Sequence, residues 1–148
     1  MGEWILFAAV VAAAAVAGVL RWKNGRFSEV TDATDAPDDA AGTTAGARLT
    51  AEDLGVALGD RATLVQFSSA FCAPCRATRV VLGQVVDLVP GVSTVEIDAE
   101  RDLDLVRRLG VLRTPTVLVL DATGAVVSRA SGAPTRDQVL VAVERALG

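Results

Sequence analysis

The residues with the most obvious chemistry are Cys72 and Cys75, the only two cysteines of the chain, which are separated by Ala73 and Pro74. An apolar, strand-like run precedes the pair at 62–67, and a helical pattern begins at it. At the start of a helix, unpaired backbone N–H groups and the helix dipole favour a thiolate, which is the nucleophile in thiol–disulfide exchange. We therefore predict that Cys72 attacks a disulfide and that Cys75, one helical turn later, resolves the mixed disulfide.

Three other uses of a cysteine pair compete with this one. A structural zinc site needs about four ligands, and the chain has no histidine and no further cysteine. A purely structural disulfide across so short a loop removes little entropy from the unfolded chain. Two inert, buried cysteines also fit the spacing, because free cysteine is often buried. Redox exchange is favoured over these alternatives provided that the pair lies in a β-α-β unit.

Composition limits the possible functions. The chain has 148 residues, a net charge of −4, and neither histidine nor tyrosine. This length allows one ordinary domain with additions. The negative charge does not favour a nucleic-acid partner, and the lack of histidine excludes imidazole catalysis and haem ligation by histidine. We expect no metal and no cofactor other than a redox-active Cys72–Cys75 disulfide.

The N-terminus is strongly apolar. From Trp4 to Leu20 there are 17 residues without a charge, followed by Arg21, Lys23 and Arg26. This pattern predicts one transmembrane helix, with residues 1–26 as a membrane anchor and its basic flank. A cleaved signal peptide is the rival interpretation, but its basic residues would precede the apolar stretch. Because basic residues tend to stay in the cytoplasm, we expect a cytoplasmic domain, with an extracytoplasmic one as the alternative.

A polar segment follows the apolar one. Residues 31–47 are small, polar and acidic, without apolar periodicity. Such a segment cannot bury enough apolar surface to fold by itself. We therefore predict a flexible acidic linker at 27–47 and a folded domain at 48–148.

The first half of the folded domain alternates strands and helices. Thr50 and Asp53 are typical of a helix start, and Gly59, Pro90–Gly91 and Gly110 are typical helix ends. The patterns predict a helix at 51–58, a strand at 62–67, a helix at 73–88 with Val80, Val81, Val85 and Leu88 on its apolar face, a strand at 92–98 and a helix at 102–109. This β-α-β-α order predicts parallel strand pairing.

The second half changes the pattern. A continuous apolar strand at 116–120, a turn at 121–124 and a strand at 125–129 predict a hairpin, and a helix follows from about Pro134 to Leu147. The sequence therefore predicts an α/β fold in which helices flank a mixed central sheet.

This arrangement resembles the thioredoxin family over about residues 48–148. Four segments carry the resemblance: the Cys-Ala-Pro-Cys motif at 72–75, the stretch 111–116 with the family's cis-proline at Pro115, the hairpin turn 121–124, and the glycine loop 131–133. The cysteine pair alone is a weak signal, but the pair followed by Thr-Pro-Thr, a hairpin and a helix is specific.

The resemblance implies a thioredoxin-like fold and a substrate groove. Pro115 is expected to be cis and to face the cysteines, and the backbone of Thr114 is expected to pair with the substrate chain. Groove residues by the same resemblance are Phe71, Ala73, Pro74, Thr114, Pro115 and Gly132. The implied partners are protein disulfide or dithiol substrates and a reductase or other dithiol as electron donor.

Several positions depart from the family pattern. Phe71 replaces the usual tryptophan, and Val80 replaces a helix-kinking proline. Gln66 stands where the family has a buried aspartate that helps to deprotonate the second cysteine, and Thr94 stands in place of its lysine partner. Because Gln66 does not titrate, that proton route is expected to be absent.

Two basic residues are expected to lie near the cysteines. Arg76 and Arg113 would stabilise a Cys72 thiolate and so lower the pKa of the Cys72 thiol. The alternative is that both are ordinary surface arginines.

The leading hypothesis is a membrane-tethered dithiol–disulfide oxidoreductase that mostly reduces protein disulfides. The alternatives are a redox-inactive binding or scaffold module with the same fold, and an envelope-facing disulfide exchange protein.

Overall fold

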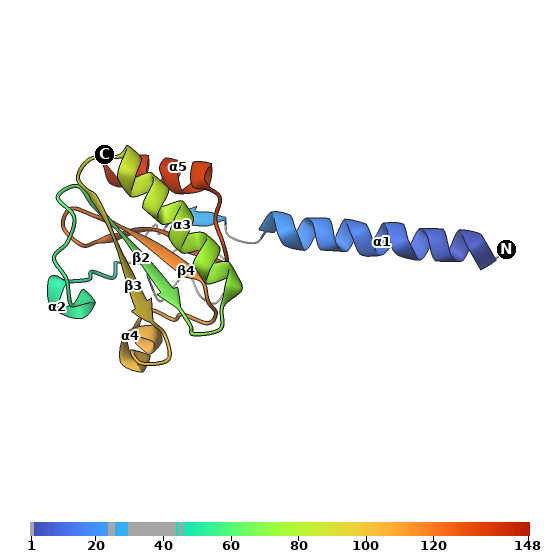
Figure 1. The fold of residues 1–148 in the computed structure, drawn as a ribbon, viewed down its shortest axis with the longest axis horizontal. Helices are drawn as coiled ribbons and strands as arrows, with labels where there is room; N and C mark the ends of the chain where they lie inside the picture. Colours follow the sequence, from blue (N-terminus) through green and yellow to red (C-terminus); the bar gives the residue numbers. More distant parts are fainter. Residues whose placement is uncertain (1, 24–25, 30–43, 45) are drawn as a thin grey trace.

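The computed structural model describes the chain except for residues 1, 24–25, 30–43 and 45. Figure 1 shows a five-stranded sheet with helices on both faces and an N-terminal helix that extends away from it. In chain order the elements are α1 (Gly2–Lys23), β1 (Phe27–Glu29), α2 (Ala51–Leu54), β2 (Ala62–Ser68), α3 (Ala73–Leu88), β3 (Val92–Asp98), α4 (Leu103–Arg108), β4 (Thr116–Asp121), β5 (Val126–Ser131) and α5 (Arg136–Ala146).

The sheet is mixed, as predicted. Its strand order is β1-β5-β4-β2-β3, in which β2 and β3 are parallel and the other neighbouring pairs are antiparallel. Helix α3 connects the parallel pair, and a short turn connects the antiparallel pair β4–β5. Strand β2 lies between β4 and β3 and is buried along its whole length, so the cysteine loop follows directly from a fully buried strand.

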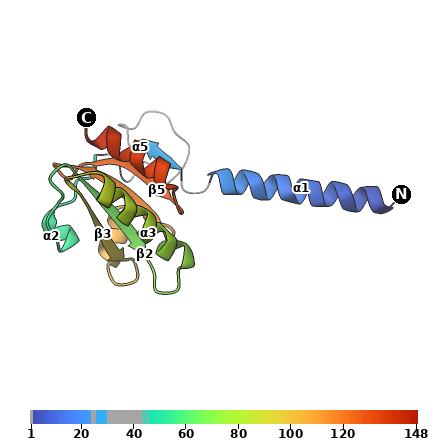
Figure 2. The same ribbon diagram turned by 45° about the horizontal axis from the view of Figure 1, so that its top comes forward.

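The two faces of the sheet form two cores. Helices α3 and α5 pack on one face, where they lie side by side in Figures 1 and 2 and meet Leu64 of β2. Helices α2 and α4 lie on the other face with Phe67 of β2. Successive side chains of a strand point to opposite faces, so both cores draw on the same strand. A strand enclosed on both sides is rich in apolar residues on both faces, which is why the sequence pattern predicted β2.

Helix α3 begins and ends as predicted, but its buried face is shifted relative to the predicted one. Its buried residues are Cys75, Thr78, Leu82 and Val85, whereas Val80 and Leu88 are exposed. The buried positions repeat every three or four residues and therefore form one stripe against the sheet. The expected face was correct at Val85 and in part at Val81, which packs against the same core, and wrong at Val80 and Leu88.

The ends of two helices, α2 and α5, also differ from expectation. Helix α2 ends at Gly55, which has a φ of 68°, and not at Gly59. A left-handed residue ends a helix, and glycine adopts that conformation without strain. Gly59 instead lies in a tight place, where a Cβ atom would come within 2.2 Å of the carbonyl oxygen of Ala62. The predicted Thr50–Asp53 capping box is present. Helix α5 starts at Arg136, after an N-cap at Thr135, and not at Pro134.

The sheet gains an edge strand that the sequence did not suggest. Residues Phe27–Glu29, which were assigned to the start of the linker, pair antiparallel with β5. Thr44, also assigned to the linker, is fully buried and accepts a hydrogen bond of 2.8 Å from Arg129. Ordered structure therefore includes residues before Arg48, while most of the predicted linker lies outside the described residues.

The predicted membrane anchor is not supported. Residues 2–23 do form a helix, but within the described residues no helix combines the length and apolar character that crossing a membrane requires.

Candidate active site

The loop between β2 and α3 presents the two cysteines, which form a disulfide with a Cα–Cα separation of 5.2 Å. Cys72 is the N-cap of α3, and the backbone N–H of Cys75 donates to its sulfur over 3.1 Å. Cys72 is half-buried, whereas Cys75 is only 1% exposed. A partner therefore has access to the sulfur of Cys72 first, and the helix start supplies the N–H donor that a thiolate at this position needs.

The Thr114–Pro115 peptide bond is cis, as the sequence predicted. The sheet brings this segment to the cysteine loop, because Thr116 at the start of β4 is the register partner of Phe67 near the end of β2. The hydroxyl oxygens of Ser69 and Thr114 lie 3.1 Å apart and join the two loops directly. The cis-proline and the cysteines thus lie at one edge of the sheet, where β2 ends and β4 begins.

The glycine loop completes this edge. The N–H of Gly132 donates to the carbonyl of Pro115 over 2.7 Å, and the Arg113 guanidinium donates to the carbonyl of Ser131 over 3.0 Å. Gly132 is buried and has a φ of 106°, a conformation that favours glycine. The structure therefore brings together the β2–α3 loop, which contributes Phe71, Ala73 and Pro74, and the segments that contribute Thr114, Pro115 and Gly132.

The surface around the disulfide is apolar and open. Phe71 is 99% exposed, Leu112 is 78% exposed, and Ala73 and Pro74 are exposed between the cysteines. Large apolar side chains with this exposure are typical of contact surfaces. Leu112 was not among the predicted site residues. The available signal was a leucine directly before Arg113, in a segment that the family resemblance already placed at the site.

Gln66 lies beneath the cysteines. Its side-chain amide donates to the backbone carbonyl of Cys75 over 2.8 Å, and the residue is 1% exposed. Thr94, the other departure from the family pattern, is exposed and pairs in register with Leu64. The register partner of Gln66 is Glu96, so β3 does place a carboxylate residue beside it.

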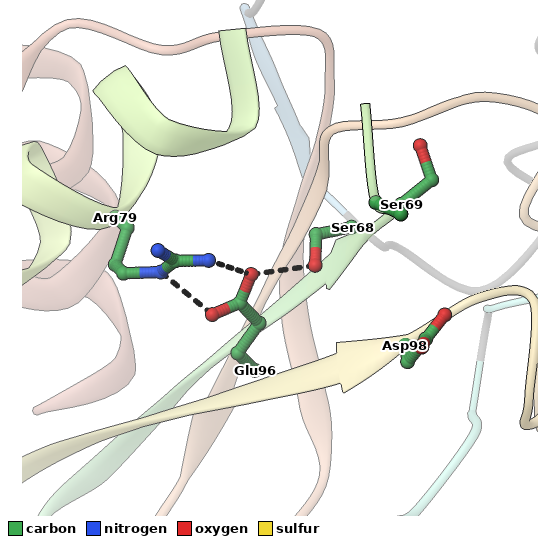
Figure 3. Close-up of a pocket in the computed structure, with 6 residues that line it drawn as sticks. Ser68, Ser69, Arg79, Glu96 and Asp98 are labelled. Carbon is green, nitrogen blue, oxygen red and sulfur yellow. Dashed lines mark hydrogen bonds and ion pairs between the residues drawn. The ribbon is translucent and has the colours of Figure 1, made fainter. Parts of the chain in front are cut away.

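A polar pocket of about 330 Å³ adjoins the cysteine loop and is lined by Ser68, Ser69, Ala70, Arg79, Glu96 and Asp98. In Figure 3 the Arg79 side chain from α3 and the Ser68 hydroxyl both point to the Glu96 carboxylate on β3. The hydrogen bond from Arg79 holds the pKa of Glu96 below its usual value, partial burial opposes this shift, and Ser68 adds to it. This cluster was missed, because nothing in a sequence pairs an arginine with a glutamate 17 residues away.

The two arginines predicted near the pair are both exposed. Arg76 follows Cys75 in α3, and Arg113 lies two residues before the cis-proline. Among the residues that the structure describes, neither forms an ion pair. Their expected effect on the Cys72 thiolate stays a prediction.

Fold and site define a thioredoxin-like protein, and the comparison with known families agrees. The family model Thioredoxin matches residues 48–145, which is more than half of the chain. The chain therefore belongs to the thioredoxin family. The matched region begins at Arg48 and contains the cysteine pair, the cis-proline and Gly132.

Similar proteins include a thioredoxin reductase and several thioredoxins. The chain is 40% identical over 58 residues to NADPH-dependent thioredoxin reductase 3 of Arabidopsis thaliana, a match covering 38% of this chain but only 11% of the reductase. The structure of chloroplastic thioredoxin z matches with a TM-score of 0.56 and 25% identity, covering 66% of this chain and 90% of that one.

Two more distant structures show the same fold. Thioredoxin f from spinach chloroplast, in its long form, has a TM-score of 0.54 at 24% identity, with 61% of this chain and 74% of that chain covered. A mutant thioredoxin from Halobacterium salinarum has a TM-score of 0.55 at 20% identity, covering 60% of this chain and 77% of that chain.

Proposed function

We propose that this protein is a dithiol–disulfide oxidoreductase that reduces protein disulfides through Cys72 and Cys75. One observation carries the proposal: Cys72, a half-buried residue at the start of α3, is disulfide-bonded to the fully buried Cys75, on the same sheet edge as a cis-proline. A purely structural disulfide has no need of a half-buried cysteine beside exposed apolar side chains. Membership of the thioredoxin family supports the same conclusion.

The reaction consists of two exchanges. In the reduced protein the Cys72 thiolate attacks one sulfur of a partner disulfide, and the other partner sulfur leaves as a thiolate that takes up a proton. Cys75 then loses its proton and attacks the Cys72 sulfur of the mixed disulfide. The partner leaves as a dithiol, and the protein is left with the Cys72–Cys75 disulfide. Two electrons have passed to the partner, and a dithiol donor or a reductase returns them.

The groove residues orient the partner. We assign Thr114 to backbone pairing with the partner chain, and Pro115 and Gly132 to the floor that holds the partner sulfur in line with Cys72. Phe71, Ala73 and Pro74 supply apolar contact around it. This chemistry needs no cofactor beyond the two cysteines.

The buried Cys75 must lose a proton during the second exchange. Gln66, which contacts its backbone carbonyl, cannot accept one. We propose that water takes the proton once the first exchange has opened the disulfide. Resolution is then expected to be slower here than in a thioredoxin with a carboxylate at this position.

Insulin reduction with a dithiol donor tests the proposal. The parent domain is expected to accelerate precipitation of the insulin B chain above the rate of the donor alone. The variants Cys72→Ser and Cys75→Ser are expected to return that rate to the donor background. A parent protein that does not exceed the background would instead favour a binding module that keeps the fold without turnover.

A further inference from the structure

The three segments around the disulfide carry positive charge only. Residues 68–76, 111–115 and 131–134 contain Arg76 and Arg113 and no carboxylate, in a chain whose net charge is −4. The Ser69–Thr114 contact and the bond from Arg113 to Ser131 hold these segments together at one edge. Arg76 and Arg113 therefore lie on the segments that border the disulfide.

Neither charge is neutralised within the part of the chain that the structure describes. Both arginines are exposed and form no ion pair there. The arginines of the neighbouring polar region differ, because Arg79 pairs with Glu96 and Arg101 pairs with Asp98. An exposed, unpaired arginine keeps its charge available for a docking protein, since no ion pair has to be broken first.

Acidic groups do lie at the same end of the sheet, in the connection between β3 and α4. Asp98 is paired with Arg101, Asp102 caps α4, and Glu100 is exposed. Among the described residues at this end of the sheet, the arginines without an ion pair thus lie on the cysteine and cis-proline segments, whereas Arg79 and Arg101 are paired with carboxylates. Because screening limits such interactions to about 10 Å at 0.1 M salt, the surface would sense charge next to a partner's cysteine more than the partner's overall charge.

The apolar and basic side chains have complementary roles in docking. Phe71 and Leu112 offer exposed apolar area, whose burial supplies affinity without regard to charge. Arginine is enriched among the side chains that dominate protein–protein binding. Charged groups mainly steer encounter and reject unsuitable partners. The partner is thereby selected by Arg76 and Arg113 and retained by Phe71 and Leu112.

We propose that Arg76 and Arg113 select protein disulfides in which aspartate or glutamate stands within a few residues of the cysteine. Arg113 directly precedes Thr114, the residue assigned to pairing with the partner chain, so a carboxylate close to the partner cysteine would lie within reach of it. Arg76 offers a second positive charge from α3. This inference rests on the proposed function and adds its substrate class.

Three matched peptides test this proposal. Each has one intramolecular disulfide and two variable positions within three residues of a cysteine. Both variable positions are aspartate in the first peptide, serine in the second and lysine in the third. The expected order of kcat/KM is aspartate, serine, lysine. At 20 mM salt each arginine is expected to contribute about twofold to fivefold to the aspartate-to-lysine ratio. At 1 M salt, where screening acts within about 3 Å, the ratio is expected to approach one.

Four variants connect the preference to the two side chains. Arg76→Gln, Arg113→Gln and their combination are expected to remove the preference stepwise, and the double exchange to glutamate is expected to reverse it. Arg61→Gln is the matched control, because it removes one exposed charge directly before β2, at the opposite end of the sheet. The ratio between peptides cancels any effect of these variants on the intrinsic reactivity of Cys72.

Turnover of hydroxyethyl disulfide, a small neutral disulfide, distinguishes a failure of the proposed function from a failure of the charge selection. If the parent protein turns over neither this compound nor any peptide, the proposed function itself fails. If it turns over hydroxyethyl disulfide and shows equal kcat/KM for the three peptides at low salt, the charge selection is wrong. It is also wrong if the double Arg→Gln variant keeps the parent's preference.

Discussion

Replacement of Gln66 by glutamate would place a titratable group directly beneath the cysteine pair. Gln66 is 1% exposed, and its side-chain amide donates to the Cys75 carbonyl over 2.8 Å. Glutamate has nearly the same shape, but its ionised form has no proton to donate to that carbonyl. Only the protonated form can restore the hydrogen bond, so both burial and the loss of a donor disfavour the charge.

The expected penalty follows from this burial. Carboxyl groups that are fully buried have their pKa raised, and a rise of two to three units corresponds to about 3–4 kcal/mol. A folded-state pKa above the unfolded value means that the folded protein holds the proton more tightly. The stability of Gln66→Glu should therefore fall as the pH rises from about 4.3 through the raised pKa, and then level off.

Urea unfolding of the disulfide form between pH 4.5 and pH 8.5 measures this effect. Gln66→Leu is the matched control, because it loses the same hydrogen bond without gaining a titratable group. Its free energy of unfolding should be lower than the parent's by about 1 kcal/mol at every pH. Other carboxylates titrate equally in all three proteins. If the stability of Gln66→Glu ran parallel to the parent's across this range, the buried environment assigned to Gln66 would be incorrect.

Two further variants test the surroundings of the disulfide. Glu96→Gln removes the charged acceptor of Arg79 and Ser68 and should lower the urea midpoint at pH 7 by a few tenths molar, about 0.3 M. The Arg79 hydrogen bond lowers the pKa of Glu96. The ionised carboxylate therefore stabilises the folded protein above the ordinary pKa of about 4.5, and this stabilisation is lost as the pH falls through the lowered pKa. The midpoints of parent and variant should therefore converge as the pH falls below this lowered pKa, and a constant difference would contradict the assignment. Phe71→Ala should raise KM for insulin about tenfold and leave turnover of hydroxyethyl disulfide unchanged. The reason is that Phe71 is fully exposed and supports only docking. Equal losses of activity with both substrates would contradict a docking role.

Much of the sheet could be predicted from the sequence because its signals are local. The parallel pair β2 and β3 and the hairpin β4–β5 follow from apolar runs, and Pro90–Gly91 and Gly124 mark the end of α3 and the hairpin turn. The cis bond before Pro115 followed from the family resemblance and not from composition. These elements are the ones that position the site.

The missed features depend on contacts between distant residues. Strand β1 has three residues and is defined only by its pairing with β5. The Glu96–Arg79 pair joins β3 to α3, and the buried face of α3 depends on how that helix lies on the sheet. A sequence pattern contains no information on such juxtapositions until the fold is known.

The most direct test of the central claim is to trap the mixed disulfide with a defined substrate. Reduced Cys75→Ser protein would be mixed with oxidised insulin, quenched with acid and analysed by mass spectrometry. The proposed roles predict a one-to-one adduct through Cys72 that accumulates because no resolving thiol remains, and no adduct with Cys72→Ser beyond the slow reaction of the buried Cys75. An adduct that forms mainly through Cys75, or none with either variant, would contradict the assignment of Cys72 as the nucleophile.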